Sequence, residues 1–298
     1  MKIIAIGEIN INLSATEGGF GSLPGGLIAR AAAILGRMGF ATAMASDAGS
    51  DIPGDMAVGA LSEAGVDTHS VDRFTEGRTA LNIFSGLTGA PTRYDAYPEE
   101  AFDIVWPRID EGDIVVFGGH YALDGRMRLR LARLLSHAAE RKAVLVYVPA
   151  YSSALEPRIT RVMPEILENL ETAHLVVTTT ADLATIFGTD NSAGCFADRV
   201  SFYCRSLVNI DAGCHRLEYF AGKEVTSAAT GGSPCESLLW QAGALAGLIG
   251  ALAAHAVTPE ALDAPGEGLR TDILEAMVRS GAEAAAEAPS WQLAVRPV

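Results

Sequence analysis

Pro24-Gly25-Gly26 opens the stretch that decides the fold of this chain, an apolar and alanine-rich run that ends in Leu35-Gly36-Arg37-Met38-Gly39. Its apolar period predicts a helix over Leu27–Met38, and the strand-like Ala41–Ala45 follows directly. Two adjacent glycines let the backbone approach a ligand closely and leave amide groups free at the start of a helix. Turn glycines also serve folding in any protein that mixes helices and strands, so a structural role and a binding role are both open here.

Short β-branched runs alternate with helical patterns along most of the 298 residues. The expected strands are Lys2–Ile6, Ala41–Ala45, Asp113–Phe117, Ala143–Val148, His174–Thr178 and Leu207–Ile210. The expected helices are Leu27–Met38, Ile52–Ala64, Arg126–Arg141, Arg161–Asn169, Asp198–Arg205, Ser233–Val257 and Thr271–Glu287. This alternation predicts an α/β fold, with a mostly parallel sheet covered by helices on both faces, as one domain over residues 1–298. Segments at about 11–23 and 78–94 break the rhythm and predict a small antiparallel flap, or lid.

Four motifs in this order resemble the N-terminal half of the ribokinase-like carbohydrate kinases, the phosphofructokinase B type. They are Gly7-Glu8-Ile9 after the first strand, Pro24-Gly25-Gly26 with its helix, Ala48-Gly49-Ser50-Asp51-Ile52-Pro53-Gly54, and Leu61-Ser62-Glu63-Ala64-Gly65-Val66-Asp67. In the third motif, the Asp51 carboxylate can cap the following helix, and Gly54 permits tight packing in its first turn. The resemblance implies a three-layer sandwich, a lid that closes over a sugar, ATP at the carboxyl ends of the strands and, frequently, a homodimer formed through the lid.

The family's catalytic motif, Asp-Thr-Thr-Gly-Ala-Gly-Asp, is replaced here by Ala229-Thr230-Gly231-Gly232-Ser233-Pro234-Cys235. In the family, the glycines hold the transferring phosphoryl group at a helix N-terminus, and the last aspartate is the general base. Cys235 stands at the base position, and Pro234 has no amide hydrogen to offer a phosphate. Ser233, Pro234 and Glu236 form a capping box with proline at the first helical position, which predicts helix initiation. Glu236 as a displaced base is the weaker alternative, since one step along a helix turns a side chain by about 100°.

Other family positions have changed as well. The substrate-binding positions implied by the resemblance are Asn12, in place of an aspartate, Gly25, Gly26, and Arg30, in place of an asparagine. The implied nucleotide-binding positions are Thr179, Asp182, Asn209, Gly232 and Ser233, and Asp211 replaces a glycine of the phosphate turn. Losing a general base lowers the rate by about 10²–10⁴ and each lost anion-binding donor by roughly 10²–10³. Coordinated change at these motifs therefore predicts a protein without efficient kinase activity.

Three functions are open on these residues. The first is a catalytically silent family member that keeps its cleft for a small metabolite, such as a sugar or sugar acid, or for a partner protein. The second is an active ATP-dependent sugar or nucleoside kinase with atypical residues, and only this function implies ATP and Mg as cofactors. The third is a structural subunit that pairs through the lid. No metal site is predicted, because the histidines and four cysteines lack metal-ligand spacing.

Charge and hydropathy exclude other classes of function. A formal net charge of −14 repels nucleic acids and anionic lipid surfaces. The apolar Leu238–Val257 contains Gln241 and His255 and predicts a buried core helix rather than a membrane span. The chain begins on a strand-like run without leader-like regions, so we expect a cytoplasmic protein. His120 is the one histidine expected near a ligand cleft, because it follows the strand that ends in Gly118-Gly119.

Arg30 gives a hypothesis about ligand chemistry. It lies in the first turn of the helix after Gly25-Gly26, where the family uses an amide side chain to hold sugar hydroxyls. If that face opens onto the cleft, a guanidinium there favours a carboxylate or a phosphate. The alternative is a salt bridge to a neighbour such as Glu8, or a solvated side chain.

Overall fold

The computed structural model describes residues 1–16, 19–84, 92–97, 105–153, 155–222, 224–229, 237–263 and 271–287. Its main sheet has nine strands in the order β13-β12-β11-β10-β9-β8-β1-β4-β5. The strands are β1 (Ile3–Ile6), β4 (Thr42–Gly49), β5 (Asp67–Phe74), β8 (Ile114–Gly118), β9 (Val144–Val148), β10 (Leu175–Thr179), β11 (Ser206–Asp211), β12 (Arg216–Ala221) and β13 (Glu224–Ala229). Pairing is parallel from β5 through β11 and antiparallel at β12 and β13. The mostly parallel sheet predicted from the sequence is confirmed.

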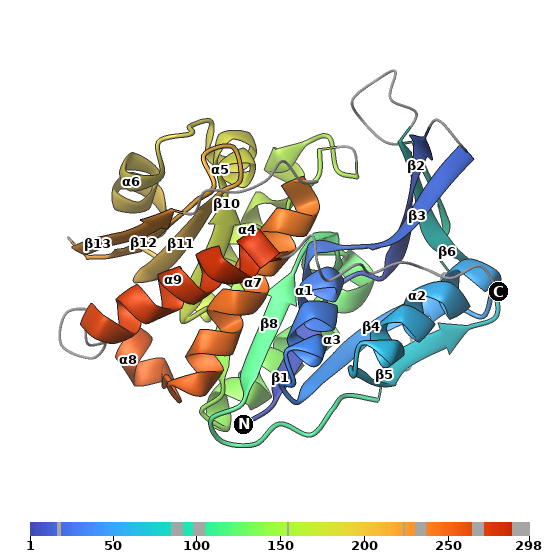
Figure 1. Ribbon diagram of the computed structural model, residues 1–298, viewed down its shortest axis with the longest axis horizontal. Coiled ribbons are helices and arrows are strands. Elements are labelled where there is room, and N and C mark those ends of the chain that lie inside the picture. The colour runs from blue at the N-terminus through green and yellow to red at the C-terminus, as the bar shows by residue number, and fades with distance from the viewer. Residues whose placement is uncertain are drawn as a thin grey trace.

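Helices cover both faces of this sheet (Figure 1). One face carries α1 (Leu27–Arg37), α2 (Ile52–Glu63), α7 (Ser237–Ala254), α8 (Pro259–Asp263) and α9 (Thr271–Glu287). The other carries α3 (Gly125–Glu140), α4 (Ile159–Thr172), α5 (Thr180–Phe187), α6 (Ser192–Cys195) and the short turns η1 (His120–Leu123) and η2 (Phe196–Val200).

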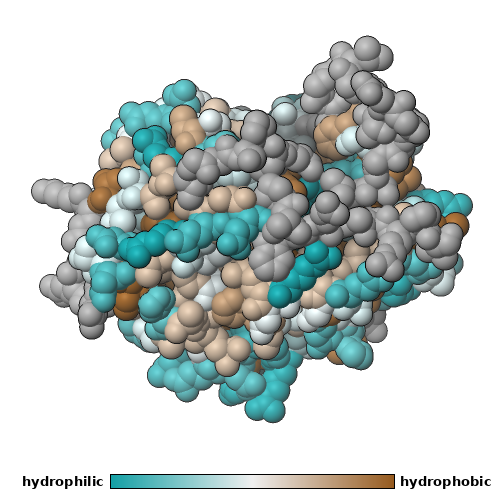
Figure 2. Space-filling view, viewed as in Figure 1, coloured by the Kyte–Doolittle hydropathy of each residue, from teal (hydrophilic) through white to brown (hydrophobic). Residues whose placement is uncertain are grey.

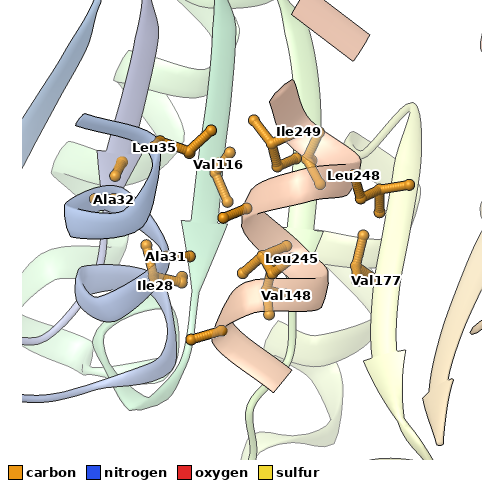
Figure 3. Close-up of a cluster of buried hydrophobic side chains, with 14 of the residues drawn as sticks. Ile28, Ala31, Ala32, Leu35, Val116, Val148, Val177, Leu245, Leu248 and Ile249 are labelled. Carbon is orange, nitrogen blue, oxygen red and sulfur yellow. The ribbon is translucent and has the colours of Figure 1, made fainter. Parts of the chain in front are cut away.

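The two cores follow from the alternation of side chains along each strand. In β1, Ile3 packs into the core under α1 and α7, whereas Ile4 packs into the core under α3 and α4. Figure 3 shows how α1 and α7 lay apolar side chains over the central strands, with Leu35 and Ile249 on either side of Val116. Each such buried aliphatic side chain stabilises the fold by about 1.5–3 kcal/mol.

Small residues let the helices on this face pack closely. A Cβ atom on Gly247 of α7 would lie 2.1 Å from the carbonyl oxygen of Ser280 in α9. The outer side of α9 carries Asp272, Glu275 and Arg279, which are exposed. Figure 2 shows hydrophilic side chains along this helix, as expected for a helix that buries only one face.

The lid is a separate four-stranded sheet in the order β3-β2-β6-β7. It consists of β2 (Asn10–Thr16), β3 (Gly19–Gly25), β6 (Arg78–Phe84) and β7 (Thr92–Ala96), close to the boundaries expected from the sequence. The expectation of an antiparallel flap was wrong in one respect, because β2 and β6 pair in parallel. These strands come from separate parts of the chain, and β2 continues directly from the region after β1 (Figure 1).

One expected helix lies elsewhere. The sequence pattern predicted a helix over Asp198–Arg205, but α6 and η2 begin at Ser192 and end at Val200. The reason is a cap, because the Asn191 side chain accepts a hydrogen bond from the Gly194 amide and starts the helix there. The start of the helix expected over Ser233–Val257 lies outside the described residues, which resume at Ser237.

Candidate functional site

A cavity of about 290 Å³ opens where the carboxyl ends of the central strands meet the lid. Residues after β1, β8 and β9 form its floor, and lid strands and the start of α1 form its walls. Its lining includes Gly7, Glu8, Asn10, Asn12, Gly26, Asn82, Phe84, Arg93, Gly118, Gly119, His120 and Ala150. Ligands of open α/β sheets bind outside the carboxyl ends of the strands, so this cavity is the candidate ligand site.

Three asparagine side chains on the lid form a connected amide cluster in this cavity. Asn82 donates through Nδ2 to Asn12 Oδ1 at 2.9 Å and to Asn10 Oδ1 at 3.3 Å. The sheet register explains the cluster, because Asn12 pairs with Asn82 across β2 and β6 and Asn10 lies two residues earlier on the same face. An amide offers both donors and acceptors, so the cluster can hydrogen-bond to hydroxyl groups of either orientation.

Gly25 and Gly26 fit closely against this cluster. A Cβ atom on Gly25 would lie 1.5 Å from Asn10 Oδ1 and 2.8 Å from Asn12 Oδ1. Gly26 has a φ of 85°, and a Cβ atom there would lie 2.5 Å from the Glu8 carbonyl oxygen. The backbone therefore requires glycine at position 26, whereas Gly25 leaves room for the side-chain amides of Asn10 and Asn12. The sequence-derived positions Asn12, Gly25 and Gly26 do come together in one place.

Glu8 and Arg93 form an ion pair at the wall of the cavity. Tyr97 Oη also donates to Glu8 Oε1 at 2.9 Å, and Asn10 Nδ2 donates to Glu8 Oε2 at 2.9 Å. Burial opposes the charge on Arg93, but Glu8 and Asp95 outweigh that effect and raise the pKa of the guanidinium above its usual value. Arg93 is thus a fixed cation that joins lid strand β7 to Glu8, in the segment between β1 and β2.

Arg30 does not lie among the described residues that line this cavity. Its side chain is buried, with 1% exposed, and its Nε donates to the Pro24 carbonyl oxygen at 2.6 Å. Glu8, the partner expected in the alternative interpretation, pairs with Arg93 instead. The geometry gives Arg30 a role in holding the turn before α1, and the anion hypothesis loses its structural basis.

The loop after β8 brings His120 to the cavity. Gly118 and Gly119 have φ values of 155° and 63°, and a Cβ atom on Gly118 would lie 1.8 Å from the Val148 carbonyl oxygen. This close approach of β8 and β9 lets the loop turn sharply and place His120 in the lining. The sequence-derived expectation for His120 therefore agrees with its position.

Thr179 and Asp182, two of the expected nucleotide-binding residues, form a capping box at the start of α5. Asp182 is buried, and Tyr151 N donates to its Oδ1 at 2.8 Å. Thr179 donates to Oδ2 from its amide at 3.1 Å and from its hydroxyl at 2.9 Å. Burial raises the pKa of Asp182 despite these hydrogen bonds. Both carboxylate oxygens already have protein partners, so the group joins β9 to α5.

Asn209 lies on the neighbouring strand β11, where Nδ2 donates to Thr180 Oγ1 at 3.2 Å. Its Oδ1 is buried and has no hydrogen-bond partner among the described residues. Asp211 follows at the end of the strand and accepts a hydrogen bond from the Cys214 amide at 3.0 Å. The carboxylate thus closes the turn from β11 to β12, at the place where the resemblance puts a glycine-rich phosphate turn.

The remaining expected site residues, Gly232, Ser233, Cys235 and Glu236, lie outside the described residues. Within the part of the chain that the structure describes, no group of three or more His, Cys, Asp or Glu side chains is placed to hold a metal ion. In the same part, no helix is long and apolar enough to cross a bilayer.

Sequence reasoning did not assign a role in the site to Glu8, which it placed only in a motif, and it missed Asn10, Asn82 and Arg93. The sequence contains a usable signal for Asn10, because it lies two residues before Asn12 and side chains at that spacing share one face of a strand. Asn82 and Arg93 carry no such signal, because only the pairing of β2, β6 and β7 brings them beside Asn12.

Comparison with known proteins identifies the same architecture. A family model described as the pfkB family carbohydrate kinase matches residues 1–198. A Pyrococcus horikoshii protein provisionally named a sugar kinase is 31% identical over 129 residues, which cover 39% of this chain and 41% of that relative. The match therefore spans less than half of the relative's length.

Solved structures extend the likeness over nearly the whole chain. Aminoimidazole riboside kinase from Salmonella enterica, solved with aminoimidazole riboside and an ATP analogue, has a TM-score of 0.80 at 13% identity and covers 97% of this chain and 93% of its own. Fructokinase with bound ATP from Xylella fastidiosa has a TM-score of 0.79 at 19% identity, with 96% and 91% covered. Fructokinase from Vibrio cholerae with fructose, ADP and calcium has a TM-score of 0.78 at 13% identity, with 96% and 92% covered. At these identities the likeness shows the ribokinase-like fold and no more.

Proposed function

Because the chain belongs to the pfkB family of carbohydrate kinases, we propose that it binds a small carbohydrate in the cavity beneath the lid and lacks efficient phosphotransferase activity. The observation that carries the first half is the amide cluster of Asn10, Asn12 and Asn82. Its amide groups lie on the lid strands that wall the cavity, and amides offer both donors and acceptors to the hydroxyl groups of a ligand. The proteins of similar structure include fructokinases and a riboside kinase, and this supports a ligand with several hydroxyl groups.

The second half rests on the residues at the positions for phosphoryl transfer. Cys235 and Pro234 replace a general base and an amide donor in the sequence. Asp182 is buried and accepts hydrogen bonds from Tyr151 and Thr179 on its two oxygens, so it already has a structural role between β9 and α5. Asp211 adds a negative charge at the turn after β11, where phosphates would have to approach. These features together disfavour productive binding of ATP.

Titration calorimetry with neutral sugars tests the carbohydrate half. We expect at least one simple hexose, pentose or riboside to bind, and Asn82→Ala to weaken that binding about tenfold or more, because the variant removes hydrogen bonds to hydroxyls and to the neighbouring amides. Thr185→Ala is the control, since Thr185 is exposed on α5 and does not line the cavity. Failure of every such compound to bind, or equal binding by Asn82→Ala, would contradict this half.

A phosphorylation assay with ATP and magnesium tests the other half. The unmodified protein should show no sustained ATP-dependent phosphorylation of any sugar that it binds. Cys235→Asp alone should not restore it, because Pro234 and Asp211 still differ from a working phosphate site. Efficient turnover by the unmodified protein would instead establish the alternative, an active sugar or nucleoside kinase that uses atypical residues.

A further inference from the structure

A second cavity, of about 310 Å³, adjoins the first on the side towards β4. The two share Glu8, Arg93, His120 and Leu155 in their linings, so they are two chambers of one cleft. We call the second one the inner chamber. Its other lining residues are Asp47, Asp95, Tyr97, Tyr121, Asp124 and Arg126.

Two polar groups in the inner chamber are buried and have no hydrogen-bond partner among the described residues. Asp47 is 2% exposed, and its Oδ2 has no partner. Tyr121 is 6% exposed, and its hydroxyl has no partner either. A buried polar group without a partner is unfavourable by about 1–3 kcal/mol, and more for a charged group. Two such groups lining one chamber indicate a place built to meet polar atoms of a ligand.

The charges of the inner chamber are unbalanced towards the negative. Four carboxyl groups line it, from Glu8, Asp47, Asp95 and Asp124, against the two guanidinium groups of Arg93 and Arg126. Arg93 pairs with Glu8 and Asp95, and Arg126 pairs with Asp124. Asp47 is the one carboxyl group of this lining that forms no ion pair with the described residues.

We infer that the inner chamber binds a positively charged amino group of the ligand, with Asp47 as its acceptor, so that the preferred ligand is a carbohydrate that carries a basic amine. This inference rests on the proposed function, because the amide cluster in the first chamber would hold the hydroxyl groups of the same molecule. An ammonium group donates to carboxylates and never accepts, which fits a chamber with an unpaired carboxylate and an excess of negative charge.

Competing occupants fit the chamber less well. A carboxylate or phosphate would meet four carboxyl groups and two guanidinium groups that are already paired. A neutral hydroxyl would satisfy the Asp47 oxygen but would leave the charge imbalance in place. The described residues hold no metal-ligating group of three or more side chains, and so an organic cation is the better candidate.

Protonation of Asp47 supplies an independent signature. Burial, followed by the negative charges of Glu8 and Asp124, raises the pKa of Asp47 to about 7, although Arg126 opposes this. The free carboxyl group therefore carries a proton over much of the acidic range. An arriving ammonium group favours the ionised carboxylate, so binding at about pH 6 should release close to one proton.

The test compares matched pairs of sugars at constant ionic strength. D-glucose, D-mannose, D-galactose and D-fructose are each titrated beside their amino-deoxy counterparts: D-glucosamine, D-mannosamine, D-galactosamine and 1-amino-1-deoxy-D-fructose. We expect at least one amino sugar to bind about tenfold or more tightly than its parent, in line with a charge-assisted hydrogen bond. Asp47→Asn should abolish that preference, whereas Asp190→Asn, which neutralises an exposed carboxylate outside the cleft, should retain it.

Calorimetry in two buffers of different ionisation enthalpy then counts the protons released by the unmodified protein. Heats that do not depend on the buffer would overturn the assignment to Asp47, and so would a preference that survives in Asp47→Asn. If parent sugars bind through the amide cluster and amino sugars bind no better, the inference fails while the proposed function stands. If no sugar of either kind binds, the proposed function fails and takes the inference with it.

Discussion

Gly25 illustrates at the residue scale how tightly the lid and the cavity are coupled. Its place in β3 lies opposite Asn10, and the space for its missing side chain is filled by the amides of Asn10 and Asn12. We expect Gly25→Ala to push these amides out of position. Overpacking of this kind lowers the free energy of unfolding by about 1–3 kcal/mol. Carbohydrate binding should fall with it, because the displaced amides are the proposed ligand contacts.

Gly59→Ala is the matched control for this substitution. Gly59 lies within α2, and a Cβ atom there would meet nothing within 4 Å. Alanine is favoured over glycine inside a helix by about 0.5–1 kcal/mol, so this variant should be slightly more stable. Urea unfolding of both variants measures the difference, and a Gly25→Ala protein as stable as the parent would contradict the packing described for the lid.

Asp47 predicts how stability depends on pH. Its pKa lies at about 7 in the folded protein against 3.8 in the unfolded chain, so the folded state holds the proton more strongly. The stability contributed by this group is therefore present below about pH 4 and is lost as the pH rises through about 7. Asp47→Asn removes the ionisation, and at about pH 8 it should raise the free energy of unfolding by roughly 2–4 kcal/mol.

The same variant should have a clearly smaller effect at about pH 5, because Asp47 is neutral there in the folded protein and ionised only in the unfolded chain, and little effect below about pH 4. Chemical unfolding at about pH 5 and about pH 8 provides the comparison, and the difference between parent and variant at each pH isolates the contribution of Asp47. An equal effect of Asp47→Asn at both pH values would show that Asp47 has an ordinary pKa.

Single residues were predictable from the sequence only where a local motif marks them. Gly25 and Gly26 stand in a motif, and Asn12 has a fixed offset from the first strand, so all three could be found. Asp47 directly precedes the motif that begins at Ala48, but it is not part of that motif, and no local pattern assigns it to a site. Its partners Glu8 and Asp124 reach it only through the order of β4, β1 and β8 in the sheet.

Asp51 shows at the element scale how a cap can hold two parts of the fold together. Its Oδ1 accepts from the Gly54 amide at 2.9 Å, which caps α2. The same carboxylate accepts from the Thr79 hydroxyl at 2.6 Å and from the Thr79 amide at 2.9 Å, which ties α2 to lid strand β6. Burial opposes ionisation of Asp51, but these hydrogen bonds outweigh it and lower its pKa.

We expect Asp51→Ala to lower the free energy of unfolding by about 2–4 kcal/mol, because it removes a helix cap and leaves the Thr79 groups without their acceptor. Asp55→Ala, in the first turn of α2, should change it by less than about 1 kcal/mol, since the ion pair of Asp55 with Arg73 lies at the surface. Denaturant unfolding compares them. Hydrogen exchange at the amides of β6 adds a second measurement, and unchanged exchange in Asp51→Ala would refute the tie between α2 and the lid.

Elements with strong periodic patterns were found from the sequence, and those with weak patterns were not. Asp51 was predicted as a cap for α2, and the structure confirms it. β5 was missed because its sequence, Asp67-Thr68-His69-Ser70-Val71-Asp72-Arg73-Phe74, is mostly polar, as fits a strand at the edge of the sheet. The helix expected at 198–205 was misplaced because the prediction followed the apolar period of those residues and overlooked Asn191, which caps the helix further upstream.

At the scale of the whole molecule, the face of the lid that points away from the cavity carries apolar side chains that a second copy of the chain could cover. Leu81 pairs with Tyr94 across β6 and β7, one residue out of step with the pair Asn82 and Arg93 that faces the cavity. Leu81 and Tyr94 therefore lie on the opposite side of the lid. They line a hollow of about 510 Å³ together with Ile52 and Pro53 at the start of α2.

The exposed apolar side chains of this surface favour a second copy of this chain as the partner that covers them. Ile52 is 66% exposed and Tyr94 is 58% exposed, although both are large apolar or aromatic side chains. β7 is an edge strand of the lid sheet, with backbone groups on one side that are not paired within the described sheet. The family resemblance implies pairing through the lid, and a second copy of this chain would cover both features at once.

We therefore predict a homodimer that forms through the outer face of the lid and weakens when that face is charged. Light scattering after size-exclusion chromatography should give a dimer mass for the unmodified protein. Tyr94→Lys should shift it towards the monomer, with a dissociation constant about tenfold or more higher, because it places a charge where an aromatic side chain would be buried. Phe202→Lys is the control, because Phe202 is 78% exposed but follows η2, far along the chain from the lid strands. A protein that stays monomeric at all concentrations, or a dimer that Tyr94→Lys leaves intact, would show that the apolar face of the lid does not form a dimer interface.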